Sequence, residues 1–238
     1  MPDDLNNIVL YEDNHIIIVN KPACIPVQED KSLDQPLTDI VKNYIKKKYS
    51  KPGEVFLGVI HRLDRPVSGV VMFARTSKAL VRLNEMMKNR QIRKIYWAVV
   101  KNKPPSDSDT LIHFLQRNET RNKSYVYDEN KSGAVIAELK YDLIASAENY
   151  YLLEIELLTG RHHQIRAQLA AINCPIKGDL KYNFPRSNKD GSIHLHARRI
   201  ELIHPVTKEL ICVEANPPDE SLWNYFIHEI KNKKIPEK

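Results

Sequence analysis

The sequence lacks any apolar run that approaches the roughly 18 to 20 residues needed to cross a lipid bilayer. Its first residues, Met1-Pro2-Asp3-Asp4, also lack the basic segment followed by an apolar one that marks a secretory signal. These two absences argue against a membrane protein and against an exported one. We therefore expect a soluble, cytoplasmic protein.

Cysteine is also scarce, since the 238 residues contain only Cys24, Cys174 and Cys212. Their number is odd, they lie far apart, and no two form a Cys-x-x-Cys pair, which argues against a disulfide framework and a zinc ribbon. Reduced thiols fit best. The sequence shows no internal repeat and no linker that would divide the chain, so we expect a single domain over residues 1–238.

Positive charge is in excess, with a formal net charge of +6 and an isoelectric point near 9.0. Such a field favours a polyanion, and nucleic acid is the natural candidate. The runs Lys46-Lys47-Lys48 and Lys231-Asn232-Lys233-Lys234 could equally be solvated faces that account for the excess. Charge alone therefore leaves nucleic-acid binding open.

Alternating or continuous apolar residues predict more strands than helices. Helices are predicted from residue 37 to a stop at 51–53, after a cap at 76 or 77, over 162–172, and over 220–230 with Asp219 as its cap. Strands are predicted at residues 8–10, 15–19, 55–60, 70–74, 95–100, 111–115, 124–127, 135–144, 150–158, 193–203 and 210–215. Because the strands come in runs, the class is α+β, with a mixed, mainly antiparallel central β-sheet flanked by helices.

The segment His61-Arg62-Leu63-Asp64-Arg65 places one carboxylate between two guanidinium groups, on a loop between two apolar strands. Burying a carboxylate there is expensive unless an arginine stays close. Asp64 is therefore predicted to be either a structural ion pair or a reactive group.

Two further segments carry polar groups that suit an RNA site. After the turn at Gly160, Arg166 lies one helical turn into a predicted helix, whose start could attract a phosphate with help from Arg161. In the strand Arg93-Lys94-Ile95-Tyr96, Lys94 and Tyr96 share one face, and a tyrosine in a basic cleft can stack on a base. Arg166 could instead be an exposed helix residue, and Tyr96 an ordinary core residue.

The order and spacing of these segments resemble the RluA-type pseudouridine synthases over most of the chain. The matching segments are Val19-Asn20-Lys21-Pro22-Ala23, His61-Arg62-Leu63-Asp64 with Ser68-Gly69, Lys94-x-Tyr96-x-Ala98, Gly160-Arg161 with His163-Gln164-Ile165-Arg166, Gly178-Asp179 with Tyr182, and Leu195-His196-Ala197 with His204-Pro205. Each match is weak alone, and together they are specific.

The resemblance implies a pseudouridine synthase catalytic-domain fold and an enzyme that isomerises uridine to pseudouridine in RNA, an RNA modification that needs neither metal nor organic cofactor. The expected partner is structured RNA, with large-subunit ribosomal RNA favoured and transfer RNA as the alternative, and the expected state is a monomer. Longer family members carry a small RNA-binding module ahead of the catalytic domain. This chain is expected to have none, so RNA contact falls to the catalytic domain.

The resemblance also implies roles for three catalytic residues. Asp64 matches the catalytic aspartate, which cleaves the C–N bond either as a nucleophile or by assisting loss of the 2′ proton. Arg166 matches the arginine that pairs with this aspartate and keeps it ionised. Tyr96 matches the tyrosine that stacks on the target base and helps to deprotonate C5.

Five residues are expected to bind substrate on the same grounds. Because a paired uridine is buried, it has to be flipped out, and Arg62 resembles the side chain that fills the vacated space. Leu195 is the candidate for an apolar wall under the uracil. His61, Lys94 and Arg161 complete the expected RNA-binding set.

Four positions depart from the family pattern: Cys24 replaces the usual Gly, Val67 and His162 replace Thr, and Gln168 replaces His. None of these changes removes a group that the reaction requires. Cys24 could alter a turn, because glycine tolerates a positive φ and cysteine does so poorly.

Three other classes of protein remain as alternatives. A metal hydrolase could use His194 and His196, which share a strand face, with His162 and His163 nearby. A protein that binds RNA without modifying it needs only the basic charge, and gains nothing from an Asp64–Arg166 pair. A glycosidase needs a second carboxylate, for which the tempting pair is Glu154 and Glu156.

Overall fold

The computed structural model describes residues 8–30 and 33–233 of the chain. The acidic start at residues 1–4 and Lys234 of the basic tail lie outside the described residues. The chain divides into two compact units, one from Met1–Arg93 and Ala197–Asn216 and the other from Lys94–His196 and Pro217–Lys238. We call them the first and the second unit, and the single-domain interpretation stays a prediction.

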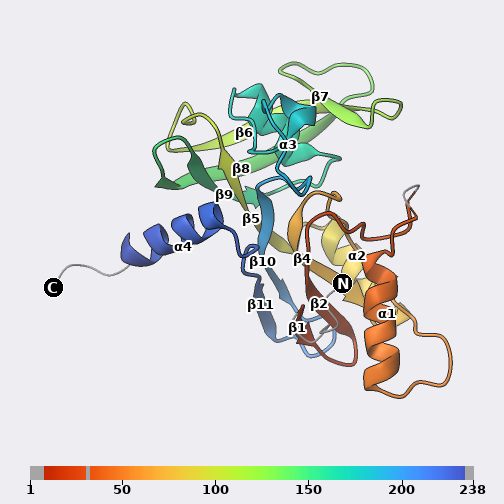
Figure 1. The fold of residues 1–238 in the computed structure, drawn as a ribbon. Coiled ribbons are helices and arrows are strands. Elements are labelled where there is room, and N and C mark those ends of the chain that lie inside the picture. Colours follow the sequence, from red (N-terminus) through yellow and green to blue (C-terminus); the bar gives the residue numbers. More distant parts are fainter. Residues whose placement is uncertain (1–7, 31–32, 234–238) are drawn as a thin grey trace. The chain divides into compact units, whose positions relative to one another are not determined.

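The first unit is built on strands β1 (Val9–Glu12), β2 (Ile16–Lys21), β3 (Gly58–Val59), β4 (Ser68–Ala74), β10 (Leu195–Ile203, whose first two residues belong to the second unit) and β11 (Leu210–Glu214). They are hydrogen-bonded in the order β1-β2-β4-β10-β11 (Figure 1), and β3, which Figure 1 leaves unlabelled, pairs with β4. Strand β2 is antiparallel to β4, with Ile16 opposite Ala74 and Lys21 opposite Gly69. Both strands are almost completely buried, so they form the core of this unit.

Two helices complete the first unit. Helix α1 (Leu37–Lys48) buries the side chains that recur at helical spacing, from Leu37 to Ile45. Helix α2 (Ser77–Lys88) begins as predicted, because the Thr76 hydroxyl accepts a hydrogen bond from the Ala79 N–H (3.2 Å).

The second unit contains a five-stranded antiparallel arrangement in the order β5-β9-β8-β6-β7. Its strands are β5 (Arg93–Val100), β6 (Ser108–Asn118), β7 (Lys123–Tyr127), β8 (Val135–Ser146) and β9 (Tyr151–Leu157). The antiparallel pairing predicted from the sequence is confirmed for these strands, but β8 pairs with β6 and not with its chain neighbour β7, so the run is not a simple meander.

Helices α3 (Gln164–Ala171) and α4 (Ser221–Lys233) cover separate hydrophobic clusters of the second unit. Ala167 of α3 packs with Leu115, Ala137 and Tyr182, the last from the 3₁₀ turn η2 (Leu180–Tyr182). In α4, Trp223 and Phe226 belong to the cluster around Trp97, Val99, Ala145 and Leu152.

Two local predictions were wrong. Residues 55–60 form only the two-residue strand β3, because only Gly58 and Val59 pair with β4, opposite Ala74 and Phe73. The cap of α4 is Glu220, which accepts from the N–H groups of Leu222 (3.3 Å) and Trp223 (3.4 Å), whereas Asp219 binds the side chain of Asn224.

The α+β class with mainly antiparallel pairing is confirmed, and four α-helices flank the strands of the described residues. None of the helices in that part of the chain combines the length and the apolar character that crossing a bilayer requires.

Candidate active site

Asp64 lies in the first unit on a tight turn closed by a hydrogen bond from the Val67 N–H to the Asp64 carbonyl (3.0 Å). Leu63 and Val67, on either side of it, are buried and hold the turn against the unit's core, while Asp64 itself is half-buried. Arg62 is exposed. The loop thus presents a carboxylate and a guanidinium from a rigid base.

Lys21, at the end of β2, anchors this turn and is completely buried. Its ammonium donates to the carbonyl oxygens of Pro22 (2.9 Å), Ile25 (2.8 Å) and Arg65 (3.1 Å). Burial lowers the pKa of Lys21 to about 7, and the Asp64 carboxylate opposes that shift. Three carbonyl oxygens match the three donors of an ammonium, so the lysine ties the end of β2 to the Asp64 loop.

Arg65, which the sequence left without a role, makes ion pairs with Asp30 (3.9 Å) and Asp34. Its carbonyl oxygen also accepts the N–H of Cys24 (2.8 Å). Cys24 has φ +67°, so this position does use the left-handed conformation that favours glycine, and the cysteine adopts it without losing the turn.

His61 and Gly69 fix the two ends of the same segment. The Met72 N–H in β4 donates to His61 Nε2 (3.1 Å), so this ring holds the loop against the strand. Gly69 has φ +115°, and a Cβ there would lie 2.5 Å from the Ala197 nitrogen in β10. Only glycine permits this close approach of the two strands. A substrate-binding role for His61 stays a prediction.

Arg166 lies in the first turn of α3 in the second unit and is only 5% exposed, so the alternative of an exposed helix residue is wrong. Its guanidinium makes a bidentate ion pair with Asp179, with Nε–Oδ2 of 2.7 Å and Nη2–Oδ1 of 2.8 Å. Asp179 is 1% exposed. The sequence missed this partner, although Gly178-Asp179 was part of the resemblance. Pairing of Arg166 with Asp64 stays a prediction.

A buried polar network supports that ion pair. The Arg166 guanidinium carbon lies 5.2 Å from the centre of the Tyr182 ring. The Tyr182 hydroxyl accepts from the Ser124 N–H (2.8 Å) and lies 3.0 Å from His163 Nδ1. Burial lowers the pKa of His163 to about 2, and the charge of Arg166 adds to the shift, so this histidine is neutral.

The other predicted residues of the second unit lie on β5, on β10 and at the start of α3. Tyr96 is 7% exposed and pairs in register with Ile155 of β9. Burial lowers the pKa of Lys94, whose Nζ would be 3.7 Å from a Cβ at Gly160. Arg161 is exposed and donates from Nε to the Ile136 carbonyl (3.0 Å), and Leu195 is buried.

Two departures from the family pattern are accommodated within the second unit. His162 stacks on His163 with ring centres 3.8 Å apart, and its Nδ1 lies 3.0 Å from the Ser124 hydroxyl. Gln168 is completely buried, and its Nε2 donates to the carbonyl oxygens of Leu111 (3.2 Å) and Ala137 (3.1 Å). Its Oε1 has no hydrogen-bond partner among the described residues.

The histidines suggested for a metal hydrolase and the glutamate suggested for a glycosidase make structural contacts. His194 stacks on Trp223 and lies 3.0 Å from Glu220, and His196 meets the edge of the same indole. Across residues 8–30 and 33–233, no group of three His, Cys, Asp or Glu side chains could hold a metal ion. Glu154 accepts a hydrogen bond from Trp97 Nε1 (3.0 Å), which is a structural contact.

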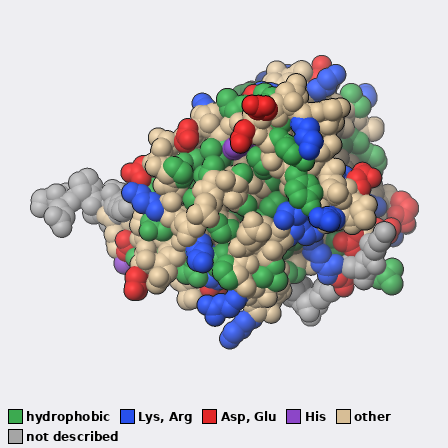
Figure 2. Space-filling view, turned by 90° about the horizontal axis from the view of Figure 1, so that it is seen from above, with side chains coloured by type: hydrophobic (Ala, Val, Ile, Leu, Met, Phe, Trp, Pro, Cys, Tyr) green, Lys and Arg blue, Asp and Glu red, His purple; other side chains and the backbone are tan. Residues whose placement is uncertain are grey.

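Basic and acidic side chains are interspersed on the face shown in Figure 2. The net positive charge therefore does not identify an RNA surface on this face. The local arrangements are more informative. The first unit presents a firmly held carboxylate, and the second holds a buried guanidinium, a buried tyrosine and a partly desolvated lysine.

Comparisons with known proteins identify one family. A family model described as RNA pseudouridylate synthase matches residues 15–171. An uncharacterised RNA pseudouridine synthase of Bacillus subtilis, YhcT, is 32% identical over 214 residues, which cover 88% of this chain and 68% of the relative.

Two further relatives have the ribosomal large subunit in their names. Ribosomal large subunit pseudouridine synthase C of Buchnera aphidicola is 31% identical over 230 residues, which cover 94% of this chain and 71% of the relative. Ribosomal large subunit pseudouridine synthase D of Xylella fastidiosa is 30% identical over 233 residues, which cover 92% of this chain and 69% of the relative.

The solved structure of human RNA Pseudouridylate Synthase Domain Containing 4 has a TM-score of 0.77 at 23% identity and covers 95% of this chain and 94% of that one. It shows that the fold is shared. With the matched family model and the relatives above 30% identity, the chain belongs to the RluA-type RNA pseudouridine synthases, enzymes that isomerise uridine in RNA.

Proposed function

We propose that this enzyme modifies one or more uridines of large-subunit ribosomal RNA. The observation that carries the proposal is that relatives at about 30% identity, aligned over more than nine-tenths of this chain, are named as ribosomal large subunit pseudouridine synthases. Transfer RNA is the alternative substrate, and activity on the two RNAs distinguishes the assignments.

Asp64 is proposed as the reacting carboxylate. The isomerisation breaks the bond from uracil N1 to ribose C1′, forms a bond from C5 to C1′, and releases the C5 hydrogen to solvent. A carboxylate can start this sequence by attacking the sugar or by assisting loss of the 2′ proton. The turn fixed by Lys21 and Val67 supports the role, because it holds the Asp64 backbone in one position.

Arg166 and Tyr96 are proposed to assist Asp64. A guanidinium favours the ionised form of a carboxylate, and the bidentate bond to Asp179 keeps Arg166 in one orientation. Tyr96 is proposed to stack on the target uracil and to help to remove the C5 proton. Its low exposure fits a site from which water is excluded.

The remaining residues are proposed to bind RNA. Exposed Arg62 fills the space left by the flipped uridine, at a cost of a few kcal/mol for unpairing. Leu195 forms an apolar wall under the uracil. His61, Lys94 and Arg161 contact the backbone, and the close approach of the Lys94 amine to Gly160 concentrates positive charge beside Arg161.

The test measures tritium release from transcripts labelled at C5 of uridine, with large-subunit ribosomal RNA and transfer RNA as separate substrates. The native enzyme should release tritium from the ribosomal transcript, and Asp64→Asn should not. Asp142→Asn, a change at an exposed residue of β8, is the matched control. Retained activity in Asp64→Asn would refute the catalytic role, and release from transfer RNA alone would refute the substrate assignment.

Arg166→Met separates catalysis from binding. If Arg166 serves the reacting carboxylate, turnover should fall far more than RNA affinity. Equal losses in both would assign Arg166 to binding alone.

A further inference from the structure

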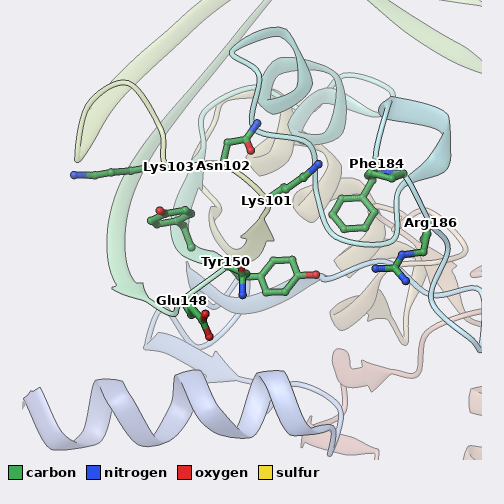
Figure 3. A pocket seen from close by; sticks show the side chains of 10 residues that line it. Lys101, Asn102, Lys103, Glu148, Tyr150, Phe184 and Arg186 are labelled. Carbon is green, nitrogen blue, oxygen red and sulfur yellow. The ribbon is translucent and has the colours of Figure 1, made fainter.

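A cavity of about 660 Å³ opens in the second unit among residues to which no catalytic or RNA-binding role has been given above. Three segments line it: the residues that follow β5, the β8–β9 hairpin, and the stretch after η2. Figure 3 shows Lys101, Tyr150, Phe184 and Arg186 pointing into the same space. Its volume lies within the range of small-molecule sites, roughly 300–1,000 Å³.

The cations of this cavity are not needed by the protein itself. Lys101 and Arg186 are exposed, and within the described residues neither has a carboxylate at ion-pair distance. Lys103 pairs with Asp107 at 3.4 Å, where both side chains are exposed, so that pair is weak. Glu148 is the one acidic residue of the lining.

The aromatic walls are held in place before any ligand arrives. Tyr150 packs against the core cluster that includes Trp97 and Trp223, and Phe184 is only 9% exposed. The Phe184 N–H donates to the carbonyl of Asp179 (3.0 Å). The cavity wall therefore continues into the residue that orients Arg166.

The lysine wall is equally well fixed. The Lys101 N–H donates to the Pro175 carbonyl (3.2 Å), and Val100, just before it, pairs with Ile176. Lys101 directly follows the end of β5 and is five residues after Tyr96, which corresponds to about 16 Å at a strand rise of about 3.3 Å per residue. A ligand here would lie well away from a base stacked on Tyr96.

We propose that this cavity binds an unpaired nucleotide of the RNA substrate, outside the target uridine, with its base against Tyr150 and Phe184 and its phosphates on Lys101 and Arg186. The proposal rests on the activity of the family and extends the proposed function. Aromatic faces accept any base and cations bind phosphate, so the site would hold single-stranded RNA with little sequence preference.

The first experiment measures binding of a fluorescein-labelled 12-nucleotide oligouridylate by anisotropy over a range of salt. Lys101→Gln with Arg186→Gln should weaken binding about tenfold at low salt. It should also reduce the slope of log K against log salt by about 1.4, since each single-strand phosphate contact contributes about 0.7. Lys140→Gln with Lys231→Gln removes the same charge from exposed residues outside the cavity and should leave the slope unchanged.

Tyr150→Leu keeps an apolar side chain against the core but removes the stacking surface. It should weaken oligouridylate binding about tenfold, with the native salt slope. Photocrosslinking of an oligonucleotide containing 5-bromouridine, mapped by mass spectrometry, should mark Tyr150 or Tyr151, which both line the cavity.

Kinetics on the labelled transcripts complete the test. The cavity variants should raise KM for a transcript with unpaired nucleotides around the target stem while the saturated rate changes little. If the charge pair Lys101 and Arg186 behaves like the control pair, or if polyglutamate displaces the oligouridylate as well as unlabelled RNA does, the proposal is overturned. A switch of substrate to transfer RNA would refute only the ribosomal assignment, because the KM effect can be measured on either RNA.

Discussion

His163 makes the stability of the second unit depend on pH in a way that can be calculated. Its ring is 8% exposed, and burial followed by the charges of Arg166, His162, Lys181 and Arg117 lowers its pKa to about 2. In the unfolded chain the pKa is about 6.5. Below pH 6.5 His163 therefore binds a proton in the unfolded state but not in the folded state. The free energy of unfolding falls with decreasing pH until the pH approaches 2.

The expected size of the effect follows from about 1.4 kcal/mol per pH unit. Between pH 7 and pH 5, His163 should lower the free energy of unfolding by about 2 kcal/mol, while a protein without this group should lose that much less. Urea unfolding followed by tryptophan fluorescence suits the measurement, because both tryptophans, Trp97 and Trp223, lie in the same unit as His163.

His163→Asn is the informative change. Asparagine tolerates the left-handed φ of +54° at this position, and its side chain is short enough to keep a polar atom towards the Tyr182 hydroxyl. Burial also lowers the pKa of His113 and His194, so the comparison is between the pH responses of the variant and the native protein. The exposed His228→Asn is the control, and an unchanged pH response in His163→Asn would refute the reasoning.

Three further predictions concern positions where the backbone or a buried charge is constrained. Gly69→Ala should cost about 3 kcal/mol or more, because φ is +115° and the new Cβ would lie 2.5 Å from the Ala197 nitrogen; urea unfolding followed by circular dichroism measures it. Cys24→Gly should stabilise the protein by about 0.5–1 kcal/mol in the same assay, because the φ of +67° strains cysteine more than glycine loses in entropy. Asp179→Asn should lower the free energy of unfolding by about 3–5 kcal/mol, measured by urea unfolding followed by tryptophan fluorescence, because it breaks the buried ion pair with Arg166. A loss no larger than that of the exposed Asp142→Asn control would contradict this estimate.

Secondary structure could be predicted from the sequence wherever a period was clear. The alternation in residues 108–157 and the helical stripes from Leu37 and Leu80 depend on one chain segment at a time, so they are visible locally. The prediction at 55–60 was wrong because an apolar run specifies neither length nor partner. The division into two units was not predicted, because two of its boundaries fall at the start of β5 and inside β10, where no linker composition marks them.

The site was predicted less completely, and for a physical reason. Motif spacing singled out Asp64 and Arg166 as chemically important, but it cannot show which groups a buried charge contacts. Asp179 lies 13 residues after Arg166 and reaches it only because the 3₁₀ turn η2 folds back against α3. The partners of Arg65 likewise come from residues some 30 positions earlier, on a segment whose sequence carries no recognisable pattern.

If Arg166 serves the reacting carboxylate, as proposed, its buried pair with Asp179 bears on catalysis as well as on folding. Removing two charges from water is expensive, and an apolar pair of similar volume would often be at least as stable, so stability alone does not account for it. What the pair provides is a guanidinium whose Nε and one Nη are fixed in direction by a carboxylate, and whose central carbon lies over the Tyr182 ring. A fixed cation acts on a reacting anion without the cost of reorganising at each turnover, which a solvated arginine would incur. We therefore expect the kinetic effect of Asp179→Asn to exceed its effect on RNA affinity, as for Arg166→Met, and equal losses would make Asp179 a purely structural residue.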